Sequence, residues 1–132
     1  MRYEFDAPIP AAALADLRQS VGWNRMEREL ADAQLHNTFQ LCCFDGAQLI
    51  GYAAVVSNGV TDAYIQDLMV HPDYQQQGIG HQLMQRTLAR LRNEGIYMVS
   101  IIYGDTDLQK YYEEFGFTTM LCGQMELRAE GD

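Results

Sequence analysis

The chain has 132 residues, with 9 basic (Lys and Arg) and 18 acidic side chains, and its formal net charge is -9. This length fits a single domain, which we expect to span residues 1–132. Nucleic acids bind clustered Lys and Arg, so the acidic balance argues against them and favours a cationic small partner.

The rest of the composition indicates a globular protein of a reducing compartment. No stretch approaches the roughly 18 apolar residues that span a bilayer, and no signal peptide is recognisable. The sequence therefore predicts no membrane partner and a cytoplasmic location. The cysteines form neither a disulfide framework nor a zinc-type pair, so no metal site is expected. They are Cys42, Cys43 and Cys122.

The first half of the chain predicts one strand, two helices and three more strands. A strand at 2–5 precedes a helix that Pro10 opens and Gly22 ends, and a second helix at 25–36. Strands follow at 39–44, 49–56 and 64–70. Asp45-Gly46 and Asn58-Gly59 between them are hairpin signals, so these three strands form an antiparallel meander.

The second half adds helices between strands. A helix from Gly78 to about residue 93 leads to a strand at 96–103, a helix at 106–115 and strands at 117–121 and 124–128. The complete order is βααβββαβαββ, an α/β fold with a mixed sheet, because a strand, a helix and another strand imply a parallel pair. The last strand offers an edge through which a homodimer can pair.

A glycine-containing loop between the strand at 64–70 and the next helix is the main candidate for a binding site. Gly78 and Gly80 open a helix whose first N–H groups are unpaired and positively polarised, which suits a pyrophosphate. His81 stands where a nucleotide-binding P-loop needs Lys, and Leu83 where the dinucleotide fingerprint needs a third glycine. A tight turn that binds no ligand is the alternative interpretation.

Three segments together resemble the GNAT acetyltransferase superfamily. Its signature is Gln/Arg-x-x-Gly-x-Gly/Ala, and its second motif is Phe-Tyr-Glu-Lys-x-Gly-Phe. The resemblance implies an acyl-CoA N-acyltransferase fold, with a mostly antiparallel sheet and a splayed parallel pair, and an enzyme that uses acetyl-CoA. The matching segments are Gln75-x-x-Gly78-x-Gly80, its lead-in Leu68-x-Val70-x-Pro72-x-Tyr74, and Tyr111-Tyr112-Glu113-Glu114-Phe115-Gly116-Phe117.

The resemblance also implies which residues contact the cofactor. Loop backbone in this family holds the CoA pyrophosphate, and the bulged strand before it holds the pantetheine arm. Asp105 stands where the family often has an Asn that binds pantetheine, but Asp lacks the amide donor. The implied contacts are Leu68, Met69, Val70, Gln75, Gln76, Gln77, Gly78, Ile79, Gly80, His81, Asp105 and Tyr112.

Two catalytic residues follow from the same resemblance. Tyr112 is expected to donate a proton to the leaving CoA thiolate, since a free tyrosine with a pKa of about 10 is protonated at neutral pH. A packed tyrosine without a chemical role is the alternative. The family often places its base at the positions of Tyr64 or Gln66. Asp67 is the nearest carboxylate, although strand alternation sends it to the opposite face unless a bulge re-aims it. His71 is a further candidate.

The acceptor is expected to be the primary amine of a small molecule, acetylated by direct transfer. Trp23 and Asn24, between the first two helices, are predicted to contact it, although Trp23 can instead fill the core. The other predicted contacts are Tyr64, Gln66 and Tyr103. Two alternatives stay open: a module that binds acyl-CoA without catalysis, and acetylation of protein or peptide amines.

Overall fold

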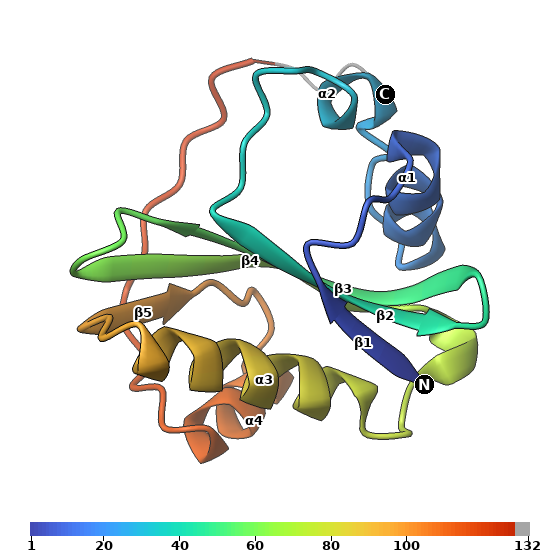
Figure 1. The fold of residues 1–132 in the computed structure, drawn as a ribbon. Coiled ribbons are helices and arrows are strands. Elements are labelled where there is room, and N and C mark those ends of the chain that lie inside the picture. Colours follow the sequence, from blue (N-terminus) through green and yellow to red (C-terminus); the bar gives the residue numbers. More distant parts are fainter. Residues whose placement is uncertain (129–132) are drawn as a thin grey trace.

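The strands form one mixed sheet, and the computed structural model describes residues 1–128 (Figure 1). They lie in the sheet in chain order, with β1 to β4 antiparallel to their neighbours and β5 parallel to β4. The strands are β1 (Arg2–Phe5), β2 (Phe39–Asp45), β3 (Gln48–Ser57), β4 (Asp62–Val70) and β5 (Met98–Ile101).

Helices cover both faces of this sheet. On one side, the α1 face, lie α1 (Ala11–Ser20) and α2 (Glu27–Leu30); on the other, the α3 face, lie α3 (Ile79–Asn93) and α4 (Gln109–Glu114) (Figure 1). The 3-10 turns η1 (Pro72–Tyr74) and η2 (Thr106–Leu108) precede α3 and α4. The α/β class and the predicted order are confirmed from the first strand through the helix at 106–115. Within residues 1–128, no helix is long and apolar enough to cross a membrane.

The two longest helices, α1 and α3, dock through apolar stripes. On the α1 face, Leu14 and Leu17 share a buried cluster with Tyr52 of β3 and Met69 of β4. These leucines are three residues apart and so lie on one side of α1. The other face is built in the same way, with the buried α3 residues spaced by three or four positions. They are Ile79, Leu83, Met84, Thr87, Leu88 and Leu91.

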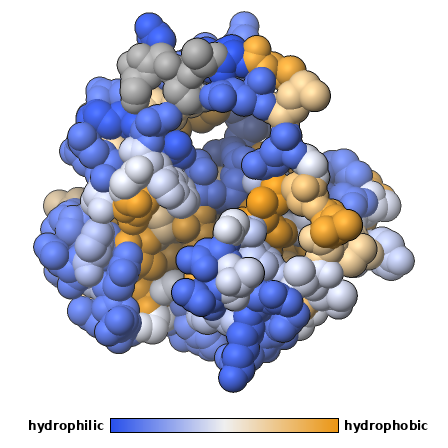
Figure 2. Space-filling view, turned by 180° about the vertical axis from the view of Figure 1, so that it is seen from behind, coloured by the Kyte–Doolittle hydropathy of each residue, from blue (hydrophilic) through white to orange (hydrophobic). Residues whose placement is uncertain are grey.

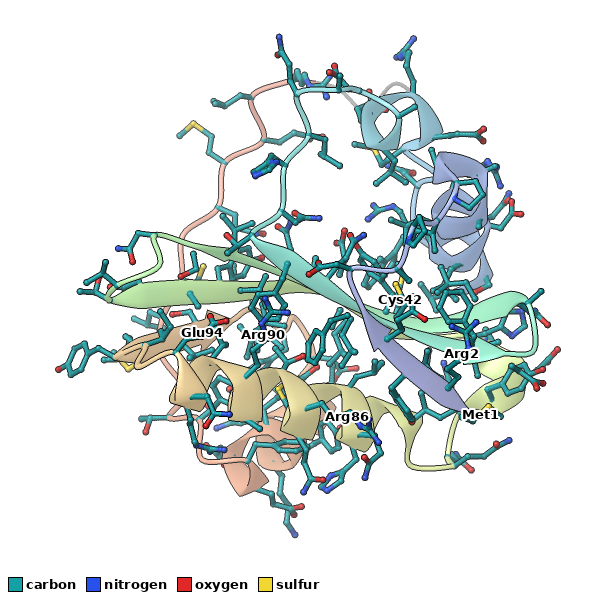
Figure 3. The ribbon with its side chains drawn as sticks, viewed as in Figure 1. Met1, Arg2, Cys42, Arg86, Arg90 and Glu94 are labelled. Carbon is teal, nitrogen blue, oxygen red and sulfur yellow. The ribbon has the colours of Figure 1, made fainter. Side chains whose placement is uncertain are left out.

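Arginines of α3 attach the first strand to this layer. Arg86 and Arg90 reach from α3 toward the sheet (Figure 3). The Arg86 guanidinium lies 4.2 Å from the Tyr3 ring centroid, and that of Arg90 lies 4.0 Å from the Phe39 ring. Stacking of arginine on aromatic rings therefore supplements the apolar core along the edge of β1.

The second predicted helix is shorter than its composition suggests. Helical hydrogen bonding is confined to Glu27–Leu30, whereas the sequence predicts residues 25–36. The Asp32 carboxylate accepts a hydrogen bond from the backbone N–H of Gln34 at 2.8 Å, which closes a local turn. Such side-chain bonds compete with the helical ladder, and here the turn replaces the helix.

The two strands predicted at 117–121 and 124–128 are not present in the structure. Residues 118–128 instead run across the molecule toward α2 (Figure 1), where Arg128 Nη2 lies 3.5 Å from Glu29 Oε2. Their apolar composition favours strands, but a strand also needs a pairing partner, which composition does not supply. The proposed homodimer edge at 124–128 is therefore wrong. The exposed side chains of this segment include Met120, Leu121, Met125 and Leu127.

Candidate active site

The parallel strands separate where β4 approaches the glycine loop. Pairing of β4 with β5 ends at Ile65 and Ile101, yet β4 continues to Val70. The splayed pair implied by the resemblance is thus confirmed, and among residues 1–128 no strand pairs with residues 66–70 of β4 on that side. An open strand edge offers N–H and C=O groups to a ligand that carries amides, as the pantetheine arm does.

The glycine loop connects this open edge to the start of α3. Gly78 has φ +82°, which favours glycine, and it precedes the first helical residue, Ile79. This change of hand turns successive N–H groups toward one side, a geometry that binds anions. The N–H groups of Ile79, Gly80 and His81 belong to the first turn and have no partner inside the helix. Gln75 supports the loop by donating from Nε2 to the Val70 carbonyl at 3.0 Å.

Gly80 has room around it that the fold does not use. A Cβ placed there would meet only the Tyr111 hydroxyl at 3.6 Å and Val70 Cγ2 at 3.8 Å, both ordinary contacts. Glycine costs a helix about 1 kcal/mol relative to alanine. Because internal packing does not require glycine here, the free space above the helix start fits a closely approaching pyrophosphate. The Tyr111 hydroxyl lies at the same place.

A bulge in β4 re-aims Asp67. Ala54 and Tyr52 of β3 pair with Gln66 and Met69, so one residue of β3 opposes two of β4. Asp67 has φ +56°, which lies in the left-handed region. The extra residue brings Asp67 to the α1 face, where its Oδ2 lies 3.2 Å from Arg18 Nη1. Regular alternation would place Asp67 and Gln66 on opposite faces of the sheet, but the bulge places both on the α1 face.

Arg18 joins this bulge to the loop between the first helices. Its Nε donates to the Asn24 carbonyl at 2.6 Å, and its guanidinium lies 5.5 Å from the Trp23 ring centroid. Trp23 is 41% exposed, so it does not fill the core. Sequence reasoning did not identify Arg18, because its role depends on a bulge some fifty positions away.

Tyr112 lies on the α3 face, among aromatic neighbours. Its ring stacks on Tyr103 at 4.9 Å and meets Tyr111 and Phe117 edge-on. Burial, followed by the influence of Tyr111 and Tyr103, raises the pKa of Tyr112 to about 12. The hydroxyl is therefore protonated at neutral pH and is able to donate.

The predicted acceptor residues divide into two groups. Tyr64 and Gln66 lie with Asp67, and burial, Asp67 and Cys122 together raise the pKa of Tyr64. Gln66 Nε2 donates to Asn37 Oδ1 at 3.4 Å. Tyr103 does not join them, because it stacks on Tyr112 and its hydroxyl bonds to Thr119 of the C-terminal segment.

Two further candidates act as local caps. The Asp105 carboxylate accepts from the Asp107 N–H at 2.9 Å and so caps η2. His71 Nδ1 accepts from the Asp73 N–H at 3.1 Å and caps η1. Both side chains are thus engaged in turns beside the site, which fits a supporting role for each.

The comparisons with known proteins agree with this geometry. Residues 10–117 match the model of the acetyltransferase (GNAT) family. An uncharacterized N-acetyltransferase, ycf52, of Gracilaria tenuistipitata var. liui is 31% identical over 120 residues, which cover 87% of this chain and 65% of that protein. The chain thus spans less than two thirds of the length of this relative and of a Prochlorococcus marinus relative, of which 61% is covered.

Solved structures extend the similarity to most of the chain. A probable acetyltransferase of unknown function from meticillin-resistant Staphylococcus aureus is 28% identical, with TM-score 0.80, over 97% of this chain and 98% of that one. A GNAT family acetyltransferase from Streptococcus pneumoniae is 26% identical, with TM-score 0.77, over 98% of each chain. With its sequence motifs, fold and site geometry in agreement, the chain belongs to the acetyltransferase (GNAT) family, whose cofactor is acetyl-CoA.

Proposed function

We propose that this chain is an N-acetyltransferase that moves the acetyl group of acetyl-CoA directly to the primary amine of a small molecule. The open edge of β4 carries the proposal. Pairing with β5 ends at Ile65, but β4 runs on to Val70 and leads to the free N–H groups at the start of α3. An edge that ends in an anion-binding turn suits an amide-bearing arm joined to a pyrophosphate.

The chain holds this ligand mainly through its backbone. The N–H groups of Ile79, Gly80 and His81 would bind the pyrophosphate, and residues 68–70 would pair with the pantetheine amides. A backbone N–H near Met69 or Val70 would polarise the thioester carbonyl. Tyr111 adds a hydroxyl beside Gly80, at the pyrophosphate end.

Asp67 and Tyr112 would move the protons. Acetyl-CoA, when bound, supplies an acetyl group activated as a thioester; the carbon–nitrogen bond forms at the amine as the carbon–sulfur bond breaks. Asp67 would take the proton that the amine nitrogen loses, directly or through a water molecule. Tyr112 would give its proton to the thiolate, so that amide and CoA thiol leave and both side chains re-equilibrate with solvent.

The course of the C-terminal segment supports a small acceptor over a folded protein. Residues 118–128 pass from the sheet to α2, and Cys122 lies close enough to influence the pKa of Tyr64. From behind, the molecule has an opening below its uppermost part, and hydrophobic side chains gather in patches lower down on both sides (Figure 2). The C-terminal segment thus runs close to Tyr64, which favours an acceptor smaller than a folded protein. A cytoplasmic location and a homodimer stay predictions.

The proposal is tested by calorimetry followed by turnover. The full chain is titrated with acetyl-CoA, with CoA and NAD as comparisons, and CoA thiol release is then followed with a panel of small amines and a panel of lysine and N-terminal peptides. Micromolar binding of acetyl-CoA with release on small amines supports the proposal. Release with peptides alone would replace the acceptor, and binding without any release would indicate a regulatory module. Failure to bind either CoA species would contradict the whole assignment.

A further inference from the structure

A cavity of about 260 Å³ lies beneath the N-terminal end of α1, on the same face as Asp67. It is lined by residues of α1, α2, β2 and β3 and of the segments that lead into α1 and β2. The acetyl-transfer chemistry described above makes no use of it. Its polar lining comes from Asp6, His36, Asn37, Gln40 and Tyr52.

The register of the sheet aligns this cavity with the reacting end of the site. Gln40 of β2 pairs with Ala54 of β3, and Ala54 pairs with Gln66 of β4, so the three lie in one row. Two strand spacings separate Gln40 from Gln66, about 10 Å.

Hydrogen bonds connect the row from end to end. Gln66 Nε2 donates to Asn37 Oδ1, and Asn37 Nδ2 donates to the Tyr52 hydroxyl, each at 3.4 Å. The Tyr52 hydroxyl in turn donates to Gln40 Oε1. A polar track thus runs from Gln66, the neighbour of Asp67, into the cavity, on a sheet face that is otherwise mostly apolar.

Three of the polar side chains that line the cavity, Asn37, Gln40 and Tyr52, are uncharged, whereas Asp6 is a carboxylate and His36 an imidazole. Burial is the largest cause that raises the pKa of Tyr52, with Cys42 and Asp67 adding to it, so this hydroxyl stays protonated. The Asp6 carboxylate is already engaged, because Oδ1 accepts from the Gln40 N–H at 3.0 Å and Oδ2 lies 3.7 Å from Arg90. The cavity therefore offers hydroxyl and amide groups, with no free carboxylate for a second ammonium.

We propose that this cavity binds the far end of the acceptor, an uncharged hydroxyl or amide group carried on a chain that spans the row from Asp67 to Gln40. This inference rests on the proposed acetyl transfer and defines its substrate class. Tyr52, Asn37 and Gln40 Oε1 satisfy one another, but within residues 1–128 no group accepts a hydrogen bond from Gln40 Nε2. A purely apolar end would bury that amide donor without a partner, and sites built for hydrogen bonding reject such analogues strongly.

Three amines of equal length test the inference. Aminohexanol, heptylamine and hexanediamine differ only in the end group, which is a hydroxyl, a methyl or a second ammonium. With the full chain and acetyl-CoA, CoA thiol release should give a kcat/KM for aminohexanol at least about tenfold above the other two. Equal values for the three amines, or a preference for hexanediamine, would overturn the inference.

Two variants locate the effect. Tyr52→Phe should abolish the preference for aminohexanol, because Asn37 and Gln40 lose the hydroxyl that orients them, while acetyl-CoA affinity stays unchanged. Tyr97→Phe, at a tyrosine that is 78% exposed, is the matched control and should keep the preference. If Tyr52→Phe kept the preference, the hydroxyl group of aminohexanol would have to bind outside this cavity, which would overturn the inference.

A separate measurement keeps the inference distinct from the proposed function. If none of the three amines is acetylated, saturation-transfer NMR with aminohexanol and heptylamine still reports on the cavity. Binding of aminohexanol that is lost in Tyr52→Phe would support the cavity even then. Equal or absent binding of the two probes would overturn it, whatever calorimetry shows for acetyl-CoA.

Discussion

The Arg18 guanidinium lies 3.2 Å from the Asp67 carboxylate and joins the end of α1 to the bulge of β4. The same side chain donates to the Asn24 carbonyl and stacks on Trp23. One arginine thus contacts both the loop predicted to meet the acceptor and the carboxylate proposed to take its proton. The charged groups are only partly exposed, at 15% and 32%, which favours a defined orientation over a mobile surface pair.

Replacing Arg18 should disturb the site more than the fold. Arg18→Ala is expected to lower the free energy of unfolding by about 1 kcal/mol and to lower kcat, because Asp67 loses the group that orients it. Acetyl-CoA affinity should stay unchanged. Trp23 is the single tryptophan of the chain, so its fluorescence reports on this loop and should shift in the variant.

The controls for Arg18 are another arginine and a conservative change. Arg28→Ala, at a side chain that is 72% exposed, should alter neither fluorescence nor kcat. Arg18→Lys keeps the charge and should restore part of kcat. If Arg18→Ala weakened acetyl-CoA binding as much as it slowed turnover, a general structural role would replace the positioning role.

Asp67→Asn tests the proposed base directly. The substitution keeps the size of the side chain but removes the proton acceptor, so kcat should fall on the order of a hundredfold. Thermal unfolding should change little, since the pair with Arg18 is partly exposed. Asp73→Asn, at a carboxylate that is 84% exposed, is the matched control and should retain full turnover. Full activity in Asp67→Asn would assign the proton to solvent or to the substrate.

Gly80 should tolerate one methyl group but not a larger side chain. Gly80→Ala meets only ordinary contacts and adds helix propensity, so stability should rise by up to about 1 kcal/mol with binding largely kept. Gly80→Val places two more carbon atoms over the free N–H groups and should weaken acetyl-CoA binding at least about tenfold in calorimetry. Unchanged affinity in Gly80→Val would place the pyrophosphate elsewhere.

Much of the fold could be predicted because its signals are local. The hairpin dipeptides at Asp45-Gly46 and Asn58-Gly59 and the apolar spacing of α3 are visible in short windows. The prediction for the end of the chain was wrong, because a strand at 117–121 needs a neighbouring strand to pair with, and the local sequence does not show whether one is present. The predicted second helix was longer than the observed one, because the Asp32 side chain closes a turn inside a stretch whose composition favours a helix.

The site could be predicted only where it lies within one motif. The glycine loop and Tyr112 were predicted from contiguous sequence segments. Their proposed roles, pyrophosphate binding and proton donation, stay predictions. Arg18, Tyr52 and Asn37 were missed, because their importance arises from contacts between distant segments. Alternation alone also could not decide the direction of Asp67, since the bulge depends on register with β3.

Tyr112→Phe separates an enzyme from a binding module. Loss of the hydroxyl should lower kcat on the order of a hundredfold, as expected for a general acid, while acetyl-CoA binding measured by calorimetry stays the same. Tyr97→Phe should behave like the unmodified chain in both measurements, because that side chain is exposed. Equal turnover with and without the Tyr112 hydroxyl would leave this residue a packing role.

Buried tyrosines should make the fold sensitive to alkali. An ordinary tyrosine has a pKa of 10.0, and burial is the main cause that raises the pKa of Tyr112 to about 12 in the fold. As pH rises, the unfolded chain therefore loses this proton before the folded chain does. The stabilisation is therefore complete below pH 10 and is lost as pH rises toward 12. Burial has the same effect on the pKa of Tyr3 and Cys42, each raised to about 12.

Urea unfolding at stepped pH values should show the free energy of unfolding falling over this pH interval. The fall should be shallower in Tyr112→Phe, which has no proton to lose, than in Tyr97→Phe. If stability fell equally steeply with pH in both variants, the pKa of Tyr112 would be the same in the folded and the unfolded chain. The raised pKa would then be wrong, and Tyr112 would not stay protonated at high pH.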